Sequence, residues 1–239
     1  MKIALLGYGK MGKEIEQAAL KRGHEIIARV DVSNAATFTA AELGRADAAI
    51  EFSTPDSAVA NIYKCFEAGV PVVVGTTGWL DRLNEVKKAC ADQNQGLFYS
   101  SNFSIGVNIF FKVNTYLAKI MNNYADYDVS IEEIHHVHKL DSPSGTGISL
   151  AVQVLEQIKR KNIWVNKAPE NMDELAIISK REGEVPGTHT VSYNSAVDAI
   201  EIRHQAHNRK GFALGAVMAA EFMMNKKGIF GMDDLLRIV

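Results

Sequence analysis

The fold of the first half of the chain is decided by residues 2–31, which read KIALLGYGKMGKEIEQAALKRGHEIIARVD. An apolar run at residues 2–6 leads into the glycine-rich turn GYGKMG and then into a helical pattern that ends near Gly23. A second apolar run, residues 25–31, comes next. Strand, glycine turn, helix and strand within roughly 30 residues form a βαβ unit, in which the two strands are parallel.

The same alternation continues to residue 103. Strands that alternate with helices of ten or more residues predict a doubly wound parallel sheet with right-handed crossovers, as in Rossmann-like α/β domains. We therefore expect residues 1–103 to form such a domain, completed by residues 211–239, which contain a helix at residues 212–224. The other expected elements are strands at residues 48–52, 71–74 and 97–99 and helices at residues 55–68 and 80–93.

Residues 104–210 have a different pattern, which predicts a second, α+β domain built on a mostly antiparallel sheet. Two long helices are expected, each with one apolar stripe facing its core. These are residues 105–122, with the stripe Ile109, Val113, Leu117 and Ile120, and residues 147–159, with the stripe Ile148, Val152, Leu155 and Ile158. Strands are expected at residues 129–137, 177–180, 188–194 and 199–206.

Composition excludes several classes of protein. The chain has 239 residues, of which 47% are hydrophobic and 23% charged, as in ordinary globular proteins and unlike disordered chains. A formal charge of −2 offers no general attraction for nucleic acid. The longest apolar stretch, residues 213–224, is interrupted by Glu221 and is shorter than the ~20 residues that span a bilayer. We expect no membrane segment, and Cys65 and Cys90 as free thiols in the cytoplasm.

The glycine turn predicts a dinucleotide site. Gly7 allows the tight turn, Gly9 lets backbone N–H groups approach a pyrophosphate at the helix N-terminus, and Gly12 allows close packing of helix on strand. Asp31 lies 24 residues after Gly7 and would accept hydrogen bonds from the adenosine ribose. The alternative is a glycine turn and a surface aspartate without a ligand.

The residues after Asp31 bear on the choice of dinucleotide. An arginine there would bind the 2′-phosphate of NADPH, but Val32, Ser33 and Asn34 follow instead. Because a carboxylate repels a phosphate, we expect NADH to be preferred to NADPH. Arg29 and Lys10 are nearby cations that leave NADPH open.

A second candidate site lies in residues 132–146, which read EEIHHVHKLDSPSGT. His135, His136, His138 and Lys139 place four potentially cationic groups within five residues, which favours an anionic ligand. On a straight strand His135 and Lys139 would share a face ~13 Å apart, so the chain must bend after Val137 for both to contact one small ligand. The N–H groups at the start of the next helix suit a carboxylate.

Three other interpretations of these segments stay open. His136 and His138, with Glu132, have the spacing of metal ligands on one strand face. The histidines could also be surface residues without a function. The chain could instead sense NADH without catalysis, although no basic recognition helix accompanies it.

Several motifs together resemble the 4-hydroxy-tetrahydrodipicolinate reductase family. They are residues 133–146, residues 75–78 (GTTG), residues 101–108 (SNFSIGVN), residues 201–209 (EIRHQAHNR) and residues 212–216 (FALGA). The resemblance covers essentially the whole chain. It implies NAD(P)H-dependent reduction of a cyclic imine dicarboxylate to tetrahydrodipicolinate, in the diaminopimelate route to lysine. It also implies homotetramers assembled through the second domain, and no metal.

The resemblance also implies roles for individual residues. His135 would be the catalytic acid/base and Lys139 a proton donor, while His136, Gly145 and Thr146 would bind a substrate carboxylate. The implied cofactor-binding residues are Gly7, Tyr8, Gly9, Lys10, Met11, Gly12, Asp31, Gly75, Thr76, Thr77, Ser100, Ser101, Asn102 and Phe103.

The sequence departs from the family pattern after Gly187, where longer relatives insert about a dozen residues. We expect a shorter second sheet, which bears on the tetramer interface more than on the active site. Ser100 and Ser101 also stand where small apolar residues are common. Fold alone leaves another two-domain NAD(P)-dependent dehydrogenase of amino-acid metabolism, or a non-enzymatic NADH sensor, as alternatives.

Overall fold

The computed structural model describes residues 1–208 and 210–237, which form two compact units. The first unit contains residues 1–105 and the chain from residue 210 onward, and the second contains residues 106–209. Arg209, the last residue of the motif at 201–209, and the final two residues of the predicted first domain lie outside the described residues.

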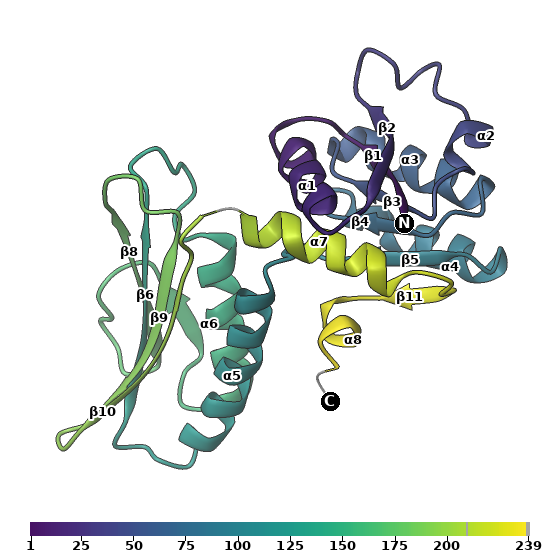
Figure 1. Ribbon diagram of the computed structural model, residues 1–239. Coiled ribbons are helices and arrows are strands. Elements are labelled where there is room, and N and C mark those ends of the chain that lie inside the picture. Colours follow the sequence, from purple (N-terminus) through teal and green to yellow (C-terminus); the bar gives the residue numbers. More distant parts are fainter. Residues whose placement is uncertain (209, 238–239) are drawn as a thin grey trace. The chain divides into compact units, whose positions relative to one another are not determined.

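The first unit is built on a six-stranded parallel sheet in the order β11-β5-β4-β3-β1-β2 (Figure 1). Helices α1 and α7 pack on one face and α3 and α4 on the other, which confirms the predicted doubly wound Rossmann-like domain. The chain order is β1 (Lys2–Leu6), α1 (Lys10–Lys21), β2 (Glu25–Val30), α2 (Ala40–Leu43), β3 (Ala48–Glu51), α3 (Pro55–Glu67), β4 (Val72–Val74), a 3₁₀ turn (Leu80–Arg82), α4 (Leu83–Asp92), β5 (Gly96–Tyr99), α7 (Lys210–Phe222), β11 (Gly228–Phe230) and α8 (Met232–Leu236).

The strand order places the sheet's switch point between β1 and β3. The chain moves outward from β1 to β2, then returns to β3 on the other side of β1. In open α/β sheets, ligands bind outside the carboxyl ends of the strands at such a point. The glycine turn follows β1 directly, so the topology places it where a dinucleotide is expected.

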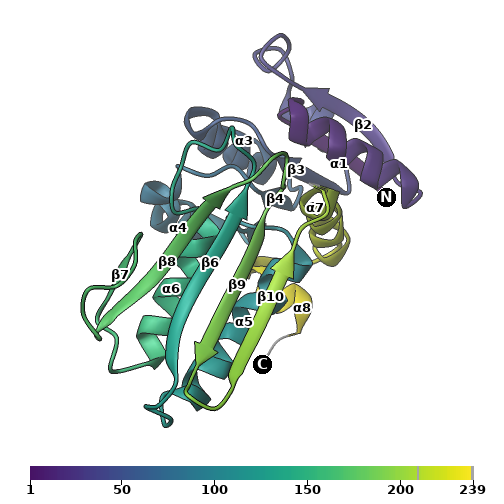
Figure 2. The same ribbon diagram turned by 90° about the vertical axis from the view of Figure 1, so that its left-hand side faces the viewer.

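The second unit has a five-stranded sheet in the order β10-β9-β6-β8-β7, with α5 and α6 covering one face (Figures 1 and 2). Its elements are α5 (Ile105–Met121), β6 (Asp128–His135), α6 (Gly145–Gln157), β7 (Ile163–Val165), β8 (Glu174–Arg181), β9 (Thr188–Asn194) and β10 (Ala199–Gln205). The predicted α+β class is confirmed. The sheet, however, is mixed rather than mostly antiparallel, because β8 runs parallel to both β6 and β7.

The parallel pairing of β6 with β8 follows from the order of the elements along the chain. Helix α6 carries the chain from the end of β6 back to the start of β7, and a crossover of this kind joins parallel strands. The sequence pattern gave no indication of β7, which is only three residues long. The expected order of strand 129–137, helix 147–159 and strand 177–180 already allowed such a crossover, which the prediction of a mostly antiparallel sheet did not include.

The predicted core stripes of the two long helices are confirmed only in part, since Ile158 is fully buried and Leu117 and Leu155 pack against the core of this unit. Ile109 and Val113 of α5 are 47% and 43% exposed, and Val152 of α6 is 43% exposed. The buried side of α5 carries Asn114 instead, whose amide donates to the Leu150 carbonyl at 3.2 Å. Both helices are apolar on more than one side, so periodicity alone could not select the buried face.

Both cysteines are free, as the sequence predicted, and both are buried. Among the described residues, no helix combines the length and the apolar character needed to cross a membrane.

Candidate functional site

The glycine turn of the first unit is shaped by close backbone contacts. Gly7 has φ +100°, and a Cβ atom there would lie 2.1 Å from the carbonyl oxygen of Phe52. A Cβ atom on Gly12 would lie 2.3 Å from the carbonyl oxygen of Gly7. Only glycine fits at these two positions.

Gly9 differs from Gly7 and Gly12 because it faces open space. A Cβ atom there would meet nothing within 4 Å, and Gly9 is the N-cap of α1 without a side-chain cap. The first N–H groups of the helix, from Lys10 to Gly12, therefore have no side-chain cap, and the helix dipole gives this end a positive potential. This geometry fits the pyrophosphate of a dinucleotide.

A cluster of hydrogen bonds around the buried Glu16 lies beside the turn and was not recognised in the sequence. Glu16 of α1 accepts hydrogen bonds from the Tyr8 hydroxyl and from Arg29, whose Nε lies 2.9 Å from Oε1. Hydrogen bonds from Arg29 and Tyr8 hold the pKa of Glu16 below its usual range. Arg29, a possible partner for the 2′-phosphate, is thus paired with Glu16.

Asp31 lies just beyond β2 and is exposed. Its Oδ1 accepts hydrogen bonds from the Ser33 backbone N–H at 2.8 Å and from the Ser33 hydroxyl at 2.5 Å. These two bonds lower the pKa of Asp31, which keeps the carboxylate charged.

The predicted cofactor-binding residues of the second half of this domain lie at the carboxyl ends of β4 and β5. Thr76, Thr77, Ser100 and Ser101 line one hollow of about 230 Å³ together with Val74, Trp79, Leu80 and Tyr99. The Thr76 hydroxyl accepts from the Ser53 N–H at 2.8 Å, which connects this loop to the end of β3.

Other predicted residues of this group have inward contacts. Ser100 donates to the Asn102 carbonyl at 2.8 Å, and Gly75 lies against the Phe52 ring, which leaves no room for a Cβ atom. The Phe103 ring is only 2% exposed and packs between Phe52 and Phe98. The Phe103 side chain is therefore part of the core.

In the second unit, β6 ends at His135, two residues earlier than predicted. The chain turns at once: Val137 donates to the Gly183 carbonyl at 3.1 Å, and Glu182 donates to the His135 carbonyl at 2.8 Å. The bend that the sequence placed after Val137 therefore comes directly after His135. The loop that joins β8 to β9 holds the strand end and forces this early turn.

Lys139 lies in the segment that follows the turn, and it is held from two sides. Its Nζ contacts both carboxylate oxygens of Asp141, at 2.7 and 2.9 Å. Arg181 donates to the carbonyl oxygens of Lys139 and Asp141, at 3.3 and 2.7 Å. The lysine ammonium is thus oriented before any ligand is present.

His135 is nearly buried, with 6% exposure. Burial lowers the pKa of His135 to about 4, with further lowering by repulsion from His189, Lys139 and Arg181 and a partial offset by Glu133. The imidazole is therefore neutral near pH 7. His136 is half-buried, whereas His138 is exposed and lies 3.6 Å from Glu184.

Helix α6 begins at Gly145, two residues earlier than predicted, because Ser144 is its N-cap. The Ser144 hydroxyl accepts from the Gly147 N–H at 3.0 Å. Among the described residues, no group accepts a hydrogen bond from the N–H of Gly145 or of Thr146, as is usual in a first helical turn. These are the two groups that the resemblance assigned to a substrate carboxylate.

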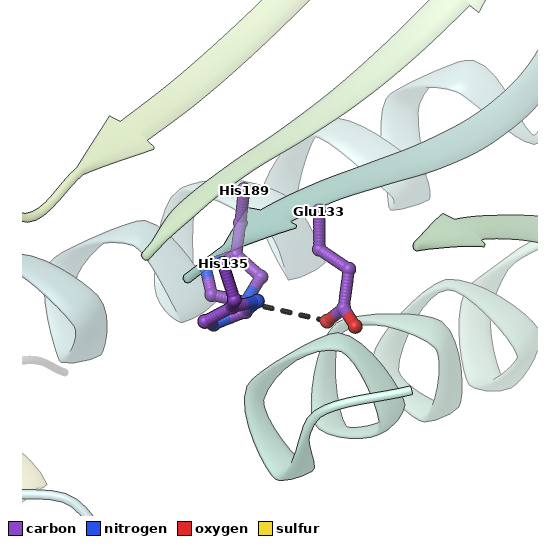
Figure 3. Close-up of side chains that lie close together, drawn as sticks. All are labelled: Glu133, His135 and His189. Carbon is purple, nitrogen blue, oxygen red and sulfur yellow. Dashed lines mark ion pairs between the residues drawn. The ribbon is translucent and has the colours of Figure 1, made fainter. Parts of the chain in front are cut away.

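His189 is a site residue that the sequence analysis missed. It lies on β9, directly opposite Glu133 of β6, and its ring centre is 5.0 Å from that of His135 (Figure 3). His135 and His189 are 54 positions apart in the chain, and only the register of β6 and β9 brings them together. Glu133 belongs to the motif at residues 133–146, but no role was predicted for it.

A metal site from these residues is not favoured by the geometry. Glu133, His135 and His189 have ligand-type atoms within 4.8 Å of one another. Both carboxylate oxygens, however, already accept hydrogen bonds from Ser144 and Ser179. The other possible set is not assembled either, because Glu132 pairs with Lys180 at 2.6 Å.

Comparisons with known proteins identify the family. The model of "Dihydrodipicolinate reductase, N-terminus" matches residues 1–103, and that of "Dihydrodipicolinate reductase, C-terminus" matches residues 106–236. The chain belongs to the dihydrodipicolinate reductase family. This assignment confirms the resemblance and separates the chain from other two-domain dehydrogenases.

Relatives with the same family name match the chain over nearly its full length. A 4-hydroxy-tetrahydrodipicolinate reductase from Christiangramia forsetii is 50% identical, over 99% of this chain and 98% of the relative. One from Archaeoglobus fulgidus is 33% identical, over 99% of this chain and 100% of the relative. A dipicolinate-bound dihydrodipicolinate reductase from Paenisporosarcina sp. TG-14 has the same fold, with a TM-score of 0.79, 22% identity and 98% of each chain covered.

A Cβ atom would meet open space at Gly9 but would collide with the backbone at Gly12. This difference allows a matched test of the predicted dinucleotide site. We expect Gly9→Ala to keep the melting temperature of the wild type and to weaken NADH binding roughly tenfold or more, because the new methyl group occupies only the anion position. Gly12→Ala should lower both stability and affinity, since its Cβ atom collides with the Gly7 carbonyl. Fluorescence titration with NADH and thermal unfolding measure the two effects. Unchanged NADH affinity in Gly9→Ala would contradict the pyrophosphate placement.

The pKa of His135 predicts a pH dependence of stability. The unfolded chain binds a proton at His135 below a pKa of ~6.5, whereas the folded chain does so only below about 4. The free energy of unfolding should therefore fall as pH drops from ~6.5 to ~4, by up to ~1.4 kcal/mol per pH unit. Urea unfolding across this range should give a shallower slope for His135→Asn. The matched control is His138→Asn at an exposed position, and equal slopes in all three proteins would refute the assignment.

Proposed function

We propose that the chain reduces 4-hydroxy-tetrahydrodipicolinate to tetrahydrodipicolinate with NAD(P)H, as a step of the diaminopimelate route to lysine. The carrying observation is the match of both family models and of full-length relatives with that activity. In this proposal a domain of residues 1–103 and 211–239, which lies within the first unit, binds the dinucleotide. A domain of residues 104–210, which contains the second unit, binds the substrate.

The substrate side of the proposal is supported by the groups around the end of β6. A ring dicarboxylate needs donors for two carboxylates, and the N–H groups of Gly145 and Thr146 suit one of them. His136 is assigned to the same carboxylate. The Lys139 ammonium, now paired with Asp141, supplies a charge for the ligand.

The proposed chemistry adds one hydride and one proton to the substrate, and one water leaves. The nicotinamide supplies the hydride when it is bound. The protein supplies the proton, with His135 as acid/base and Lys139 as proton donor. A neutral His135 must gain a proton before it can donate one, and two ligand carboxylates nearby favour the protonated imidazole.

The proposed cofactor side uses the turn from Gly7 to Gly12 and Asp31, together with the residues at the ends of β4 and β5. Their full set is Gly7, Tyr8, Gly9, Lys10, Met11, Gly12, Asp31, Gly75, Thr76, Thr77, Ser100, Ser101, Asn102 and Phe103. For Phe103 we propose only a backbone contribution, since its ring is buried in the core.

On the resemblance, we propose that the chain is cytoplasmic and forms homotetramers through the second unit. Sedimentation equilibrium tests the subunit number.

The activity is tested by NADH oxidation at 340 nm with freshly made product of the preceding synthase. We expect substrate-dependent oxidation by the wild type, and a kcat lower by ~10² or more in His135→Ala with nearly unchanged NADH affinity. Lys139→Ala should impair both kcat and KM, because Lys139 supplies charge as well as a proton. NADH binding without any substrate-dependent oxidation would instead identify a sensor.

A preference for NADH over NADPH is proposed from two charges. The ionised Asp31 repels a 2′-phosphate, and Arg29 is neutralised by Glu16. We expect a lower KM for NADH than for NADPH, and a smaller difference in Asp31→Ser. Initial rates with each dinucleotide measure this, and a lower KM for NADPH in the wild type would overturn the preference.

A further inference from the structure

A buried carboxylate joins four elements of the second unit. Glu133, on β6, has no exposed surface. It accepts hydrogen bonds from the Ser144 N–H, at 2.9 Å to Oε1 and 3.1 Å to Oε2, and from the Ser144 hydroxyl at 2.5 Å. Ser179 of β8 donates at 2.8 Å, and Nε2 of His189 on β9 lies 3.6 Å away. One side chain therefore connects β6, β8, β9 and the start of α6.

The carboxylate is charged despite its burial. Burial alone would raise the pKa of Glu133, but interactions with His189, Ser144 and Ser179 outweigh it and lower the pKa to about 2. A fixed negative charge at the N-terminus of α6 is also stabilised by the helix dipole. The fit is tight, because a Cβ atom on Gly147 would lie 2.6 Å from Oε2.

The same bonds orient His189. The Ser144 hydroxyl gives its proton to Glu133 and accepts from the Gly147 N–H. At 3.1 Å from that hydroxyl, Nε2 of His189 must then be the donor, which assigns a proton to Nε2. The His189 ring in turn packs edge-on against His135, at 72°.

Four charged or titratable groups surround His135. Glu133 attracts a proton on its imidazole, whereas His189, Lys139 and Arg181 oppose one. His189 itself also faces His204 of β10. Glu133 and His189 thus act on His135 with opposite sign, and they reach it from two neighbouring strands.

We propose that Glu133 and His189 are positioning residues of the reduction: Glu133 seats Ser144 and His189, and His189 sets the orientation and charge of His135. In this arrangement one carboxylate holds both Ser144, the N-cap of the helix whose first N–H groups would bind substrate, and His189, the ring against which His135 packs. The inference rests on the proposed function of His135, Gly145 and Thr146.

The test compares Glu133→Gln and His189→Asn with the matched control Glu132→Gln. Glu132 is the adjacent residue on β6, points to the opposite sheet face and pairs with Lys180, so its substitution removes an equal charge outside the network. Three quantities are measured in each protein: the titration midpoint of the His135 ring by NMR, the Kd of dipicolinate, and kcat and KM. The Kd of NADH reports on the unchanged first unit.

Loss of the Glu133 charge should move the His135 midpoint to lower pH, and loss of the His189 ring should move it to higher pH, each by ~0.5 unit or more. In Glu133→Gln we also expect dipicolinate binding to weaken tenfold or more and kcat/KM to fall ~10². Glu132→Gln should match the wild type, and the Kd of NADH should change in none of the variants.

Two results would overturn the proposal. One is a Glu133→Gln protein that matches Glu132→Gln in dipicolinate affinity and midpoint. The other is a uniform loss of stability and activity with no movement of the midpoint, which is the signature of a purely structural carboxylate. Should Glu133→Gln fail to fold, the midpoint of His189→Asn decides alone. Absence of turnover in the wild type would refute the proposed activity, while the midpoints and dipicolinate affinities would still test the positioning.

Discussion

The two candidate binding sites both depend on backbone N–H groups at the start of a helix for which the described residues supply no acceptor. Glycine at the N-cap of α1 provides no side-chain acceptor, so the first-turn donors remain available for an anion. At α6, Ser144 satisfies only the Gly147 N–H and leaves those of Gly145 and Thr146. In the proposed function each unit would thus bind negative charge with main-chain donors, which are fixed by the fold and do not depend on a side-chain rotamer.

Holding such donors in place requires compensating interactions inside each unit. In the first unit the steric fit of Gly7 and Gly12 fixes the turn. In the second unit a buried carboxylate does the equivalent work, because Glu133 accepts from both the main chain and the hydroxyl of Ser144. A charge with no exposed surface would be costly alone, but here several donors stabilise it.

The sequence predicted the features that depend on local order. The turn GYGKMG, Asp31 and the alternation of strands and helices were enough for the parallel sheet. The contact between Glu133 and His189 could not be predicted, since it needs the antiparallel register of β6 and β9. The buried faces of α5 and α6 were assigned only partly correctly because both helices are apolar on several sides. The end of β6 at His135 was placed too late because it depends on main-chain hydrogen bonds to residues 182 and 183.

The charges around His135 explain how such a site can serve an acid/base reaction. Before substrate binds, His135 is neutral, Lys139 is paired with Asp141, and Arg181 is bound to main-chain carbonyls. Lys139 therefore has a counter-ion, whereas Arg181 remains a positive charge whose donors are occupied by carbonyl oxygens. A dianionic ring changes this balance, since its carboxylates compete with Asp141 for Lys139 and favour a proton on the imidazole. For the proposed reduction, the proton would then be acquired together with the substrate rather than stored in the free protein.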